Sequence, residues 1–136
     1  MLNWGWKLHA LVTHVWRQAL VLLYRHRFGS YGQALDFDPH GDYTYETIYC
    51  GDHVSLGVRP RLVATRSKIT IGHHVMFGAE VTIRGGNHRI DMVGRFMDTI
   101  TEAEKRPQDD LDVFVGDDVW IGDRAIVLHG VTIGRG

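Results

Sequence analysis

A six-residue repeat runs through the C-terminal two-thirds of this chain and restricts what the chain can fold into. Each unit has an aliphatic residue, any residue, a second aliphatic residue and, in seven of ten units, glycine. The regular units lie at 69–72, 75–78, 81–84, 113–116, 119–122, 125–128 and 131–134. Three less regular units lie at 48–51, 54–57 and 63–66. Units of one length that recur in this way indicate a single repeated structural element.

A period of six predicts short strands rather than a helix. The apolar face of a helix recurs every 3.6 residues, whereas two inward residues separated by one outward residue are typical of a strand. Glycine after each pair suits a tight turn, because it adopts backbone conformations that are closed to other residues. Stacked units of this kind form a parallel β-helix, with three hexapeptides in each triangular coil. We therefore predict an all-β fold, a parallel β-helix, over residues 45–136.

Length, charge and cysteine content narrow the class of protein. A chain of 136 residues with 44% hydrophobic residues and 16 glycines is typical of one globular domain. A net charge of −1 with scattered basic residues gives no electrostatic footprint for nucleic acid, so we expect no nucleic-acid partner. The single cysteine, Cys50, excludes an intramolecular disulfide and occupies an inward repeat position. We expect it to pack in the core of a cytoplasmic protein.

Residues 1–32 differ from the repeats and are expected to form a basic amphipathic helix. This segment is rich in Trp, Leu and Val, and it has basic residues but no acidic residue before Asp36. Arg17 and the histidines break the run of apolar residues that a membrane span requires, and no small-residue cleavage site of a secretory signal follows. Two interpretations stay open. Residues 1–28 either pack on the first coil or on another subunit, or lie on an anionic membrane, peripherally at its inner face.

Residues 84–112 are expected to leave the coil as a long loop. The spacing from Val81 to Val113 is not a multiple of six, and the segment between them contains no complete repeat. It is rich in charged residues, and 99–105 could form a helical turn or two. Long loops inside a compact domain are usually functional or disordered.

The sequence Gly85-Gly86-Asn87-His88 stands where this loop begins. The two glycines let the backbone turn out of the strand and leave space beside it. A histidine presented there can take a proton from an acceptor near neutral pH. His88 is therefore our candidate for a general base.

Together these features resemble the left-handed β-helix acyltransferases, which include the bacterial maltose, galactoside and surface-polysaccharide O-acetyltransferases. The resemblance rests on the hexapeptides, the run at 85–91, the loop after it, and the sequences at 119–122 and 130–134. It implies a left-handed homotrimer with active sites between subunits, acetyl-CoA as donor and a sugar or polysaccharide hydroxyl as acceptor, hence a place in polysaccharide biosynthesis. It also implies that His88 deprotonates the hydroxyl, which attacks the thioester without a covalent enzyme intermediate. Asn87 matches the residue before the base and would help to shape the site.

Four further residues are candidates for binding the substrates. Strand alternation points Trp120 outward, which favours a subunit contact or the acyl-CoA channel. Gly130 opens the run at 130–134 and is assigned to the acetyl-CoA side. Asp91 could orient an imidazole or cap a turn. Arg89 could receive an anionic acceptor or the CoA phosphates, but loop salt bridges explain it equally well.

Two other classes of function compete with this assignment. A zinc carbonic anhydrase on a β-helix would need a histidine pair five residues apart, and the repeat region contains no such pair, so we expect no metal. A non-catalytic scaffold stays the alternative. The sequence stops at Gly136 in the middle of a hexapeptide and without a capping element, so we expect a truncated β-helix whose open end associates with other chains.

Overall fold

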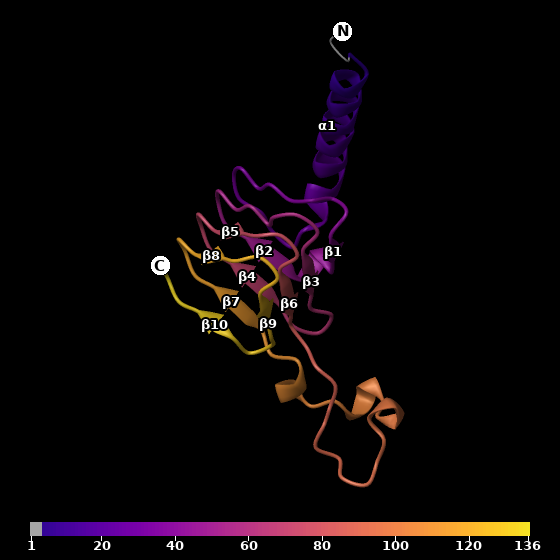
Figure 1. The fold of residues 1–136 in the computed structure, drawn as a ribbon. Coiled ribbons are helices and arrows are strands. Elements are labelled where there is room, and N and C mark those ends of the chain that lie inside the picture. Colours follow the sequence, from indigo (N-terminus) through magenta and orange to yellow (C-terminus); the bar gives the residue numbers. More distant parts are fainter. Residues whose placement is uncertain (1–3) are drawn as a thin grey trace.

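A computed structural model describes residues 4–136 as a stack of parallel strands with one long N-terminal helix (Figure 1). The helices are α1 (Trp4–Tyr24) and the short 3₁₀ segments η1 (Arg25–Arg27), η2 (Tyr45–Thr47), η3 (Met97–Thr99), η4 (Glu102–Glu104) and η5 (Pro107–Asp109). The strands are β1 (Asp42–Tyr43), β2 (Ile48–Cys50), β3 (Arg61–Val63), β4 (Ile69–Ile71), β5 (Met76–Phe77), β6 (Thr82–Arg84), β7 (Val113–Val115), β8 (Trp120–Ile121), β9 (Ile126–Val127) and β10 (Thr132–Ile133).

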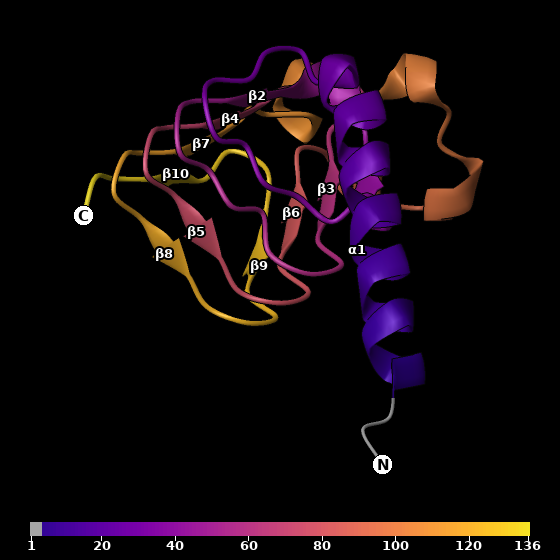
Figure 2. The ribbon, with the colours of Figure 1, turned by 90° about the horizontal axis from the view of Figure 1, so that it is seen from above.

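The strands form three sheets, with the orders β1-β3-β6-β9, β10-β7-β4-β2 and β5-β8. Every pairing within them is parallel. Viewed from above, the sheets lie along three sides of the coil, and successive strands of the chain pass from one side to the next (Figure 2). This arrangement is compatible with the predicted parallel β-helix. The handedness of the coil stays a prediction.

Strand register shows how the repeat builds the coil. Phe114 pairs with Thr132, 18 positions later, which is three hexapeptides. Ile48 pairs with Ile69, 21 positions later, so that coil contains three residues more than the period requires. Ile69 pairs with Val113, 44 positions later, because the long loop is inserted in that coil.

Aliphatic residues at the inward positions stack to form the core. Ile48, Ile69 and Val113 are paired in register on β2, β4 and β7, and each is 0% exposed. Cys50 lies in the same core and is buried, as the repeat pattern predicts. The sequence interpretation was wrong for the unit at 63–66, because Leu62 and Ala64 point inward instead.

The turns of one coil are tied to the next coil by aspartates. The carboxylate of Asp117 accepts the backbone N–H of His73 at 2.8 Å, and Asp123 binds Ala79 in the same way at 2.8 Å. Gly72 leaves room for this contact, since a Cβ there would lie 2.4 Å from the Asp117 carboxylate. The recurrent glycines thus allow successive coils to approach closely, in addition to allowing the tight turns.

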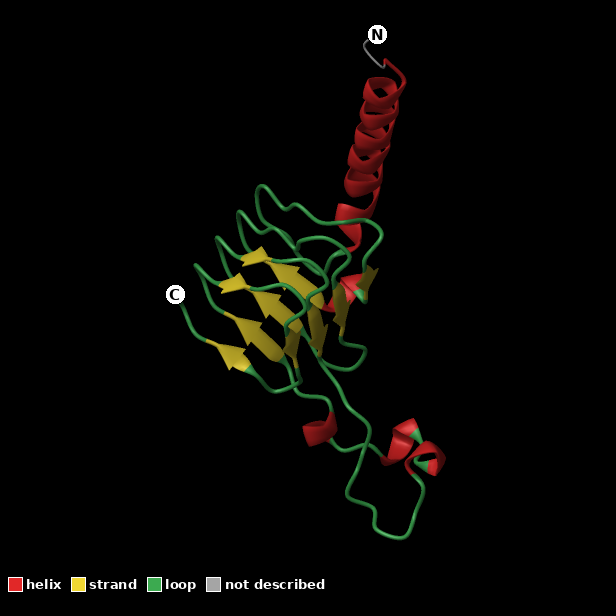
Figure 3. Ribbon diagram, viewed as in Figure 1, coloured by secondary structure: helices red, strands yellow, loops and turns green. Residues whose placement is uncertain are grey.

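Helix α1 leaves the N-terminal end of the coil and extends away from the strands (Figures 1 and 3). Only its last turns contact the coil, where Val21 is buried and Arg17 donates to the Asp36 carboxylate at 2.8 Å. Phe28 follows the helix and packs edge-to-face on Phe37 and Tyr45, which fixes the connection. None of the described helices is long and apolar enough to cross a membrane.

Candidate functional site

The segment 85–112 leaves the coil after β6 and returns at β7, projecting from the opposite end of the molecule to α1 (Figure 1). It contains the 3₁₀ turns η3, η4 and η5. Thr101 and Glu104 cap η4 reciprocally, since each side chain binds the backbone N–H of the other residue. The expectation of a helical turn near 99–105 agrees with η4.

Gly85 and Gly86 allow the loop to start close against the coil. A Cβ at Gly85 would lie 2.5 Å from the Ala64 Cβ, and one at Gly86 would lie 2.3 Å from the Asp110 carboxylate. The backbone N–H of Gly85 still donates to the Val63 carbonyl at 2.8 Å, so the parallel pairing continues to the exit point. The residues that follow are therefore held at a fixed place beside β3 and β6.

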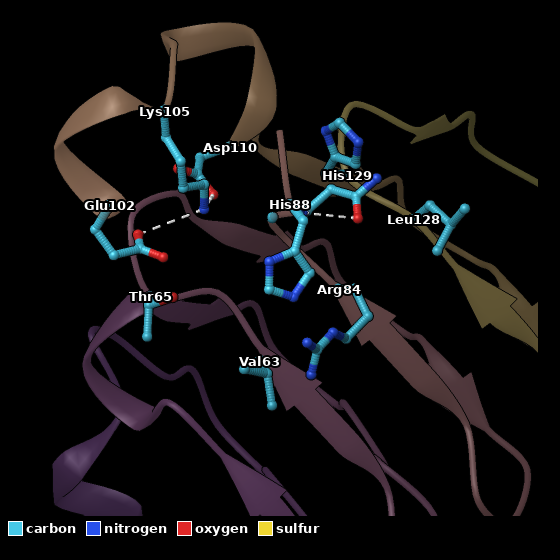
Figure 4. A pocket seen from close by; sticks show the side chains of 11 residues that line it. Val63, Thr65, Arg84, His88, Glu102, Lys105, Asp110, Leu128 and His129 are labelled. Atoms are coloured by element: carbon cyan, nitrogen blue, oxygen red, sulfur yellow. Dashed lines mark hydrogen bonds and ion pairs between the residues drawn. The ribbon is translucent and has the colours of Figure 1, made fainter. Parts of the chain in front are cut away.

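A pocket of about 320 Å³ lies between the coil and the loop (Figure 4). Its lining comes from β3, β6, the loop and the turn after β9: Val63, Thr65, Arg84, Gly86, Asn87, His88, Glu102, Lys105, Asp110, Leu128 and His129. In Figure 4 the imidazole of His88 points into this pocket, beside Arg84 and Thr65. His88 is exposed, so solvent reaches the pocket.

Asn87 fixes the backbone on which His88 stands. Its side-chain oxygen accepts the backbone N–H of His88 at 2.9 Å, and its own N–H donates to the carbonyl of Asp109 at 2.8 Å. These bonds join the first residues of the loop to its last 3₁₀ turn. Asn87 can therefore position His88 without touching its imidazole.

Charged side chains hold the far wall of the pocket against the coil. Lys105 and Asp110 form an ion pair with 2.6 Å between Nζ and Oδ1, and their side chains are only 11% and 6% exposed. Arg66 lies 3.5 Å from the other oxygen of Asp110 and donates to the carbonyl of Glu102 at 2.7 Å. Glu102 also lies 3.6 Å from Lys105. Through Arg66, the network connects the segment after β3 to both η4 and the end of the loop.

Asp91 and Arg89 interact with each other inside the loop. Arg89 Nε donates to Asp91 at 2.9 Å, and its NH1 donates to the carbonyl of Glu104 at 2.7 Å. Arg106 donates to the other oxygen of Asp91. These contacts lower the pKa of Asp91, chiefly through the hydrogen bond from Arg89. The Asp91 carboxylate thus contacts two arginines rather than the imidazole of His88, and the salt-bridge interpretation of Arg89 accounts for its contacts.

Trp120 and Gly130 lie outside the pocket. Trp120 is 75% exposed on β8, beside Met76 of β5. Gly130 has φ +76°, and it lines a separate surface hollow with Phe114 and Thr132. Within residues 4–136, the structure brings together Asn87 and His88, places Asp91 and Arg89 in the loop nearby, and leaves Trp120 and Gly130 apart.

Sequence reasoning missed most of the pocket wall. From the sequence, Glu102, Lys105 and Asp110 are only members of a charged loop, and Thr65 and Leu128 are only repeat positions, yet all five line the pocket. His129 also lines the pocket, and its Nδ1 is buried with no hydrogen-bond partner among the described residues. The Thr-x-x-Glu pattern at 101–104 is a capping signal that could have placed η4, but no local signal places its side chains beside His88.

The geometry fits proton transfer at a bound molecule. A histidine that faces a solvent-open pocket can accept a proton near neutral pH, and the neighbouring acids and bases can bind polar groups. Among residues 4–136, no group of three or more His, Cys, Asp or Glu is arranged to hold a metal ion.

Comparisons with known proteins point to acyl transfer. The chain is 37% identical over 68 residues to a galactoside O-acetyltransferase of Lactococcus lactis subsp. lactis (strain IL1403), a match that covers 49% of this chain and 28% of that protein. It is 38% identical over 68 residues to a putative acetyltransferase of Schizosaccharomyces pombe, with 50% and 29% covered. The matches thus span less than a third of each relative. No family model and no solved structure matches the chain. The names of both relatives support an acetyltransferase family.

Proposed function

We propose that the protein is a left-handed β-helix O-acetyltransferase that moves an acetyl group from acetyl-CoA to a hydroxyl of a sugar or polysaccharide. One observation carries the proposal: the imidazole of His88 points into the pocket where the long loop leaves the coil (Figure 4). The relative named galactoside O-acetyltransferase supports both the reaction and a sugar acceptor.

The proposed reaction needs one base and no covalent enzyme intermediate. An imidazole nitrogen of His88 takes the proton of the acceptor hydroxyl while its oxygen attacks the thioester carbonyl carbon. The carbon–sulfur bond then breaks, and the departing thiolate of CoA takes the proton back from His88. Most of the remaining catalysis comes from holding the hydroxyl and the thioester in line, which is the task of the pocket walls.

Residues around His88 have positioning roles in this scheme. Asn87 holds the His88 backbone. Asp110 pairs with Lys105 inside the loop, and Arg66 connects Asp110 and Glu102 to the coil. Glu102 and Arg84 line the pocket where hydroxyl groups of an acceptor would bind. Polar side chains with fixed neighbours are well suited to recognise a hydroxyl-rich molecule.

The donor site is proposed to be shared between subunits of a homotrimer. Trp120 of β8 carries a large apolar ring that is 75% exposed, and Met76 beside it is 58% exposed. Apolar side chains that adjoin on a surface are typical of an interface. In the trimer, Trp120 and Gly130 would contribute to the binding of acetyl-CoA beside a pocket that contains His88.

Replacement of His88 tests the proposal. His88→Ala should lower acetyl transfer to a sugar acceptor by about two to four orders of magnitude, because loss of a general base has effects of this size. The release of CoA is measured with acetyl-CoA and a panel of mono- and oligosaccharides. His40→Ala is the matched control, since His40 is also exposed but lies outside the pocket.

The two variants give distinguishable outcomes. If His88→Ala binds acetyl-CoA normally but loses turnover, and His40→Ala keeps both, the result supports His88 as a general base. Turnover that survives in His88→Ala at the rate of the unaltered protein removes His88 from the mechanism. If the unaltered protein binds neither acetyl-CoA nor any sugar, the scaffold alternative replaces the enzyme.

A further inference from the structure

Helix α1 carries an apolar face that is open to solvent. Successive positions of an α-helix are rotated by about 100°, so nine apolar side chains of α1 fall within an arc of roughly 140°. This apolar face consists of Trp4, Leu8, Leu11, Val12, Val15, Trp16, Ala19, Leu22 and Leu23. Its eight larger members are each between 53% and 78% exposed. The arc contains no charged residue, although it spans the whole length of the helix.

The apolar face points away from the coil. The side chains that contact the coil, those of Arg17, Val21 and Tyr24, lie on nearly the opposite side of the helix. Arg17 donates to Asp36 and to the carbonyl of Phe37 at 3.1 Å, which fixes the rotation of α1 about its axis. Packing on the coil therefore leaves the apolar face free, and Figure 1 shows most of α1 beyond the strands.

The charges that accompany this face are all positive. Between positions 4 and 35 the chain has no acidic residue. Of its four basic residues, Arg17 pairs with Asp36 on the opposite side of the helix, which leaves Lys7, Arg25 and Arg27. Lys7 lies near the edge of the apolar face, and Arg27 is held at the base of the helix by stacking 4.4 Å above the ring of Tyr45. Cations beside an apolar arc that includes tryptophans suit a surface of anionic phospholipid headgroups, where aromatic rings sit at the boundary with the acyl chains.

We propose that α1 docks the protein on the surface of an anionic phospholipid bilayer. The helix lies in the plane of the headgroups with its apolar face inserted and its cations beside the lipid phosphates. A bilayer of this kind satisfies both features of the helix. A second copy of α1 could cover the apolar face, but it would bring only further cations close to those of the first copy. The proposal is independent of the acetyl transfer proposed above.

A matched pair of substitutions tests the docking. Val15 lies within the apolar face and Thr13 lies outside it, both are exposed, and Glu at either position adds the same negative charge to the same part of α1. Binding is measured by co-sedimentation with vesicles of equal parts phosphatidylglycerol and phosphatidylcholine, and with vesicles of phosphatidylcholine alone. Circular dichroism checks that both variants keep the fold.

We expect the unaltered protein to prefer the anionic vesicles and to bind less as salt rises from roughly 0.05 to 0.5 M. Val15→Glu should weaken binding by about tenfold or more, because a carboxylate must enter the apolar layer, and Thr13→Glu should weaken it by about twofold at most. Tryptophan fluorescence should be quenched by brominated lipid in the unaltered protein and not in Val15→Glu.

Three outcomes would overturn the proposal. The first is an absence of vesicle binding, and the second is an equal loss in both variants, which would reflect net charge alone. The third is an assembly in lipid-free buffer that sedimentation velocity detects and Val15→Glu dissolves, because α1 would then contact a second copy of the chain.

Discussion

Replacement of Asp110 by Asn tests whether this carboxylate, which pairs with Lys105 inside the loop and lies 3.5 Å from Arg66 of the coil, holds the loop 85–112 in place. The Asp110 side chain is 6% exposed and pairs with Lys105 at 2.6 Å, so the substitution leaves the Lys105 ammonium largely enclosed and without its nearest counter-charge. Removing one partner of a buried pair costs about 3–5 kcal/mol. Glu102, at 3.6 Å from Lys105, and the Asn oxygen both compensate in part, which leaves about 2 kcal/mol for opening of the loop.

Hydrogen exchange at individual amides of the loop measures this change in the free energy of loop opening. The amide of Asn87 donates to the Asp109 carbonyl and is exposed when the loop opens, so its exchange should accelerate roughly thirtyfold. The amide of Gly72, bonded to Val115 at 2.8 Å inside the coil, serves as the reference that should change little. Asp98→Asn is the matched control, because it makes the same chemical change in an exposed part of the same loop.

The reasoning fails if Asn87 exchanges no faster in Asp110→Asn than in Asp98→Asn. It also fails if Asn87 and Gly72 accelerate equally, since the pair would then stabilise the whole coil rather than the loop. A double variant adds a further check. Lys105→Met should cost less in the Asp110→Asn background than in the unaltered protein, because residues that interact directly are not additive.

Two further predictions follow from pKa values. Hydrogen bonds from Arg95 and Thr101 lower the pKa of Glu104 from 4.5 to about 2, so this carboxylate stabilises the folded loop fully above pH 4.5 and progressively less as the pH falls toward 2. Relative to Gly72, hydrogen exchange in residues 85–112 should accelerate as the pH falls from 4.5 to 2, and Glu104→Gln should remove this pH dependence. If the variant keeps the same pH dependence, Glu104 is not its source. Burial raises the pKa of Cys50 to about 12, so its thiol should react with a disulfide reagent at about pH 8 only as fast as the protein unfolds. Rapid reaction of the native protein would show that the first coil opens.

The inward positions of most strands could be predicted from the sequence. Side chains of a strand alternate between its two faces, and the six-residue spacing aligns each strand with the next. The exception at 63–66 has a local cause. Pro60 is buried and takes the first inward position of a unit at 60–63, six residues after Val54, and the three extra residues of this coil follow β3, before Ile69. The pattern of aliphatic residues still allowed either Val63 or Leu62 to point inward. The pairing of Leu62 with Ile83 decides between them.

Only the part of the candidate site that lies at the loop exit could be predicted from the sequence. His88 and Asn87 follow the glycines at the loop exit, so their place depends on a local turn that the sequence shows. Lys105 and Asp110 reach the pocket only because the loop folds back on the coil, and His129 reaches it from the turn after β9. Contacts between segments that are distant in the chain have no periodic signature. A single sequence therefore indicates the candidate base but not the wall opposite it.

The register explains why a long loop can be inserted at this point without disturbing the coil. Ile69, Met76 and Thr82 each pair with a residue 44 positions later, so the offset is the same on all three sides after the loop has been passed. The insertion lies at a corner between β6 and β7, where no ladder has to slip. One wall of the pocket is thus a rigid coil and the other is a loop whose sequence is free of the repeat. Substitutions at the inward positions of the coil should act mainly on stability, whereas substitutions in the loop can alter what the pocket binds and leave the core unchanged.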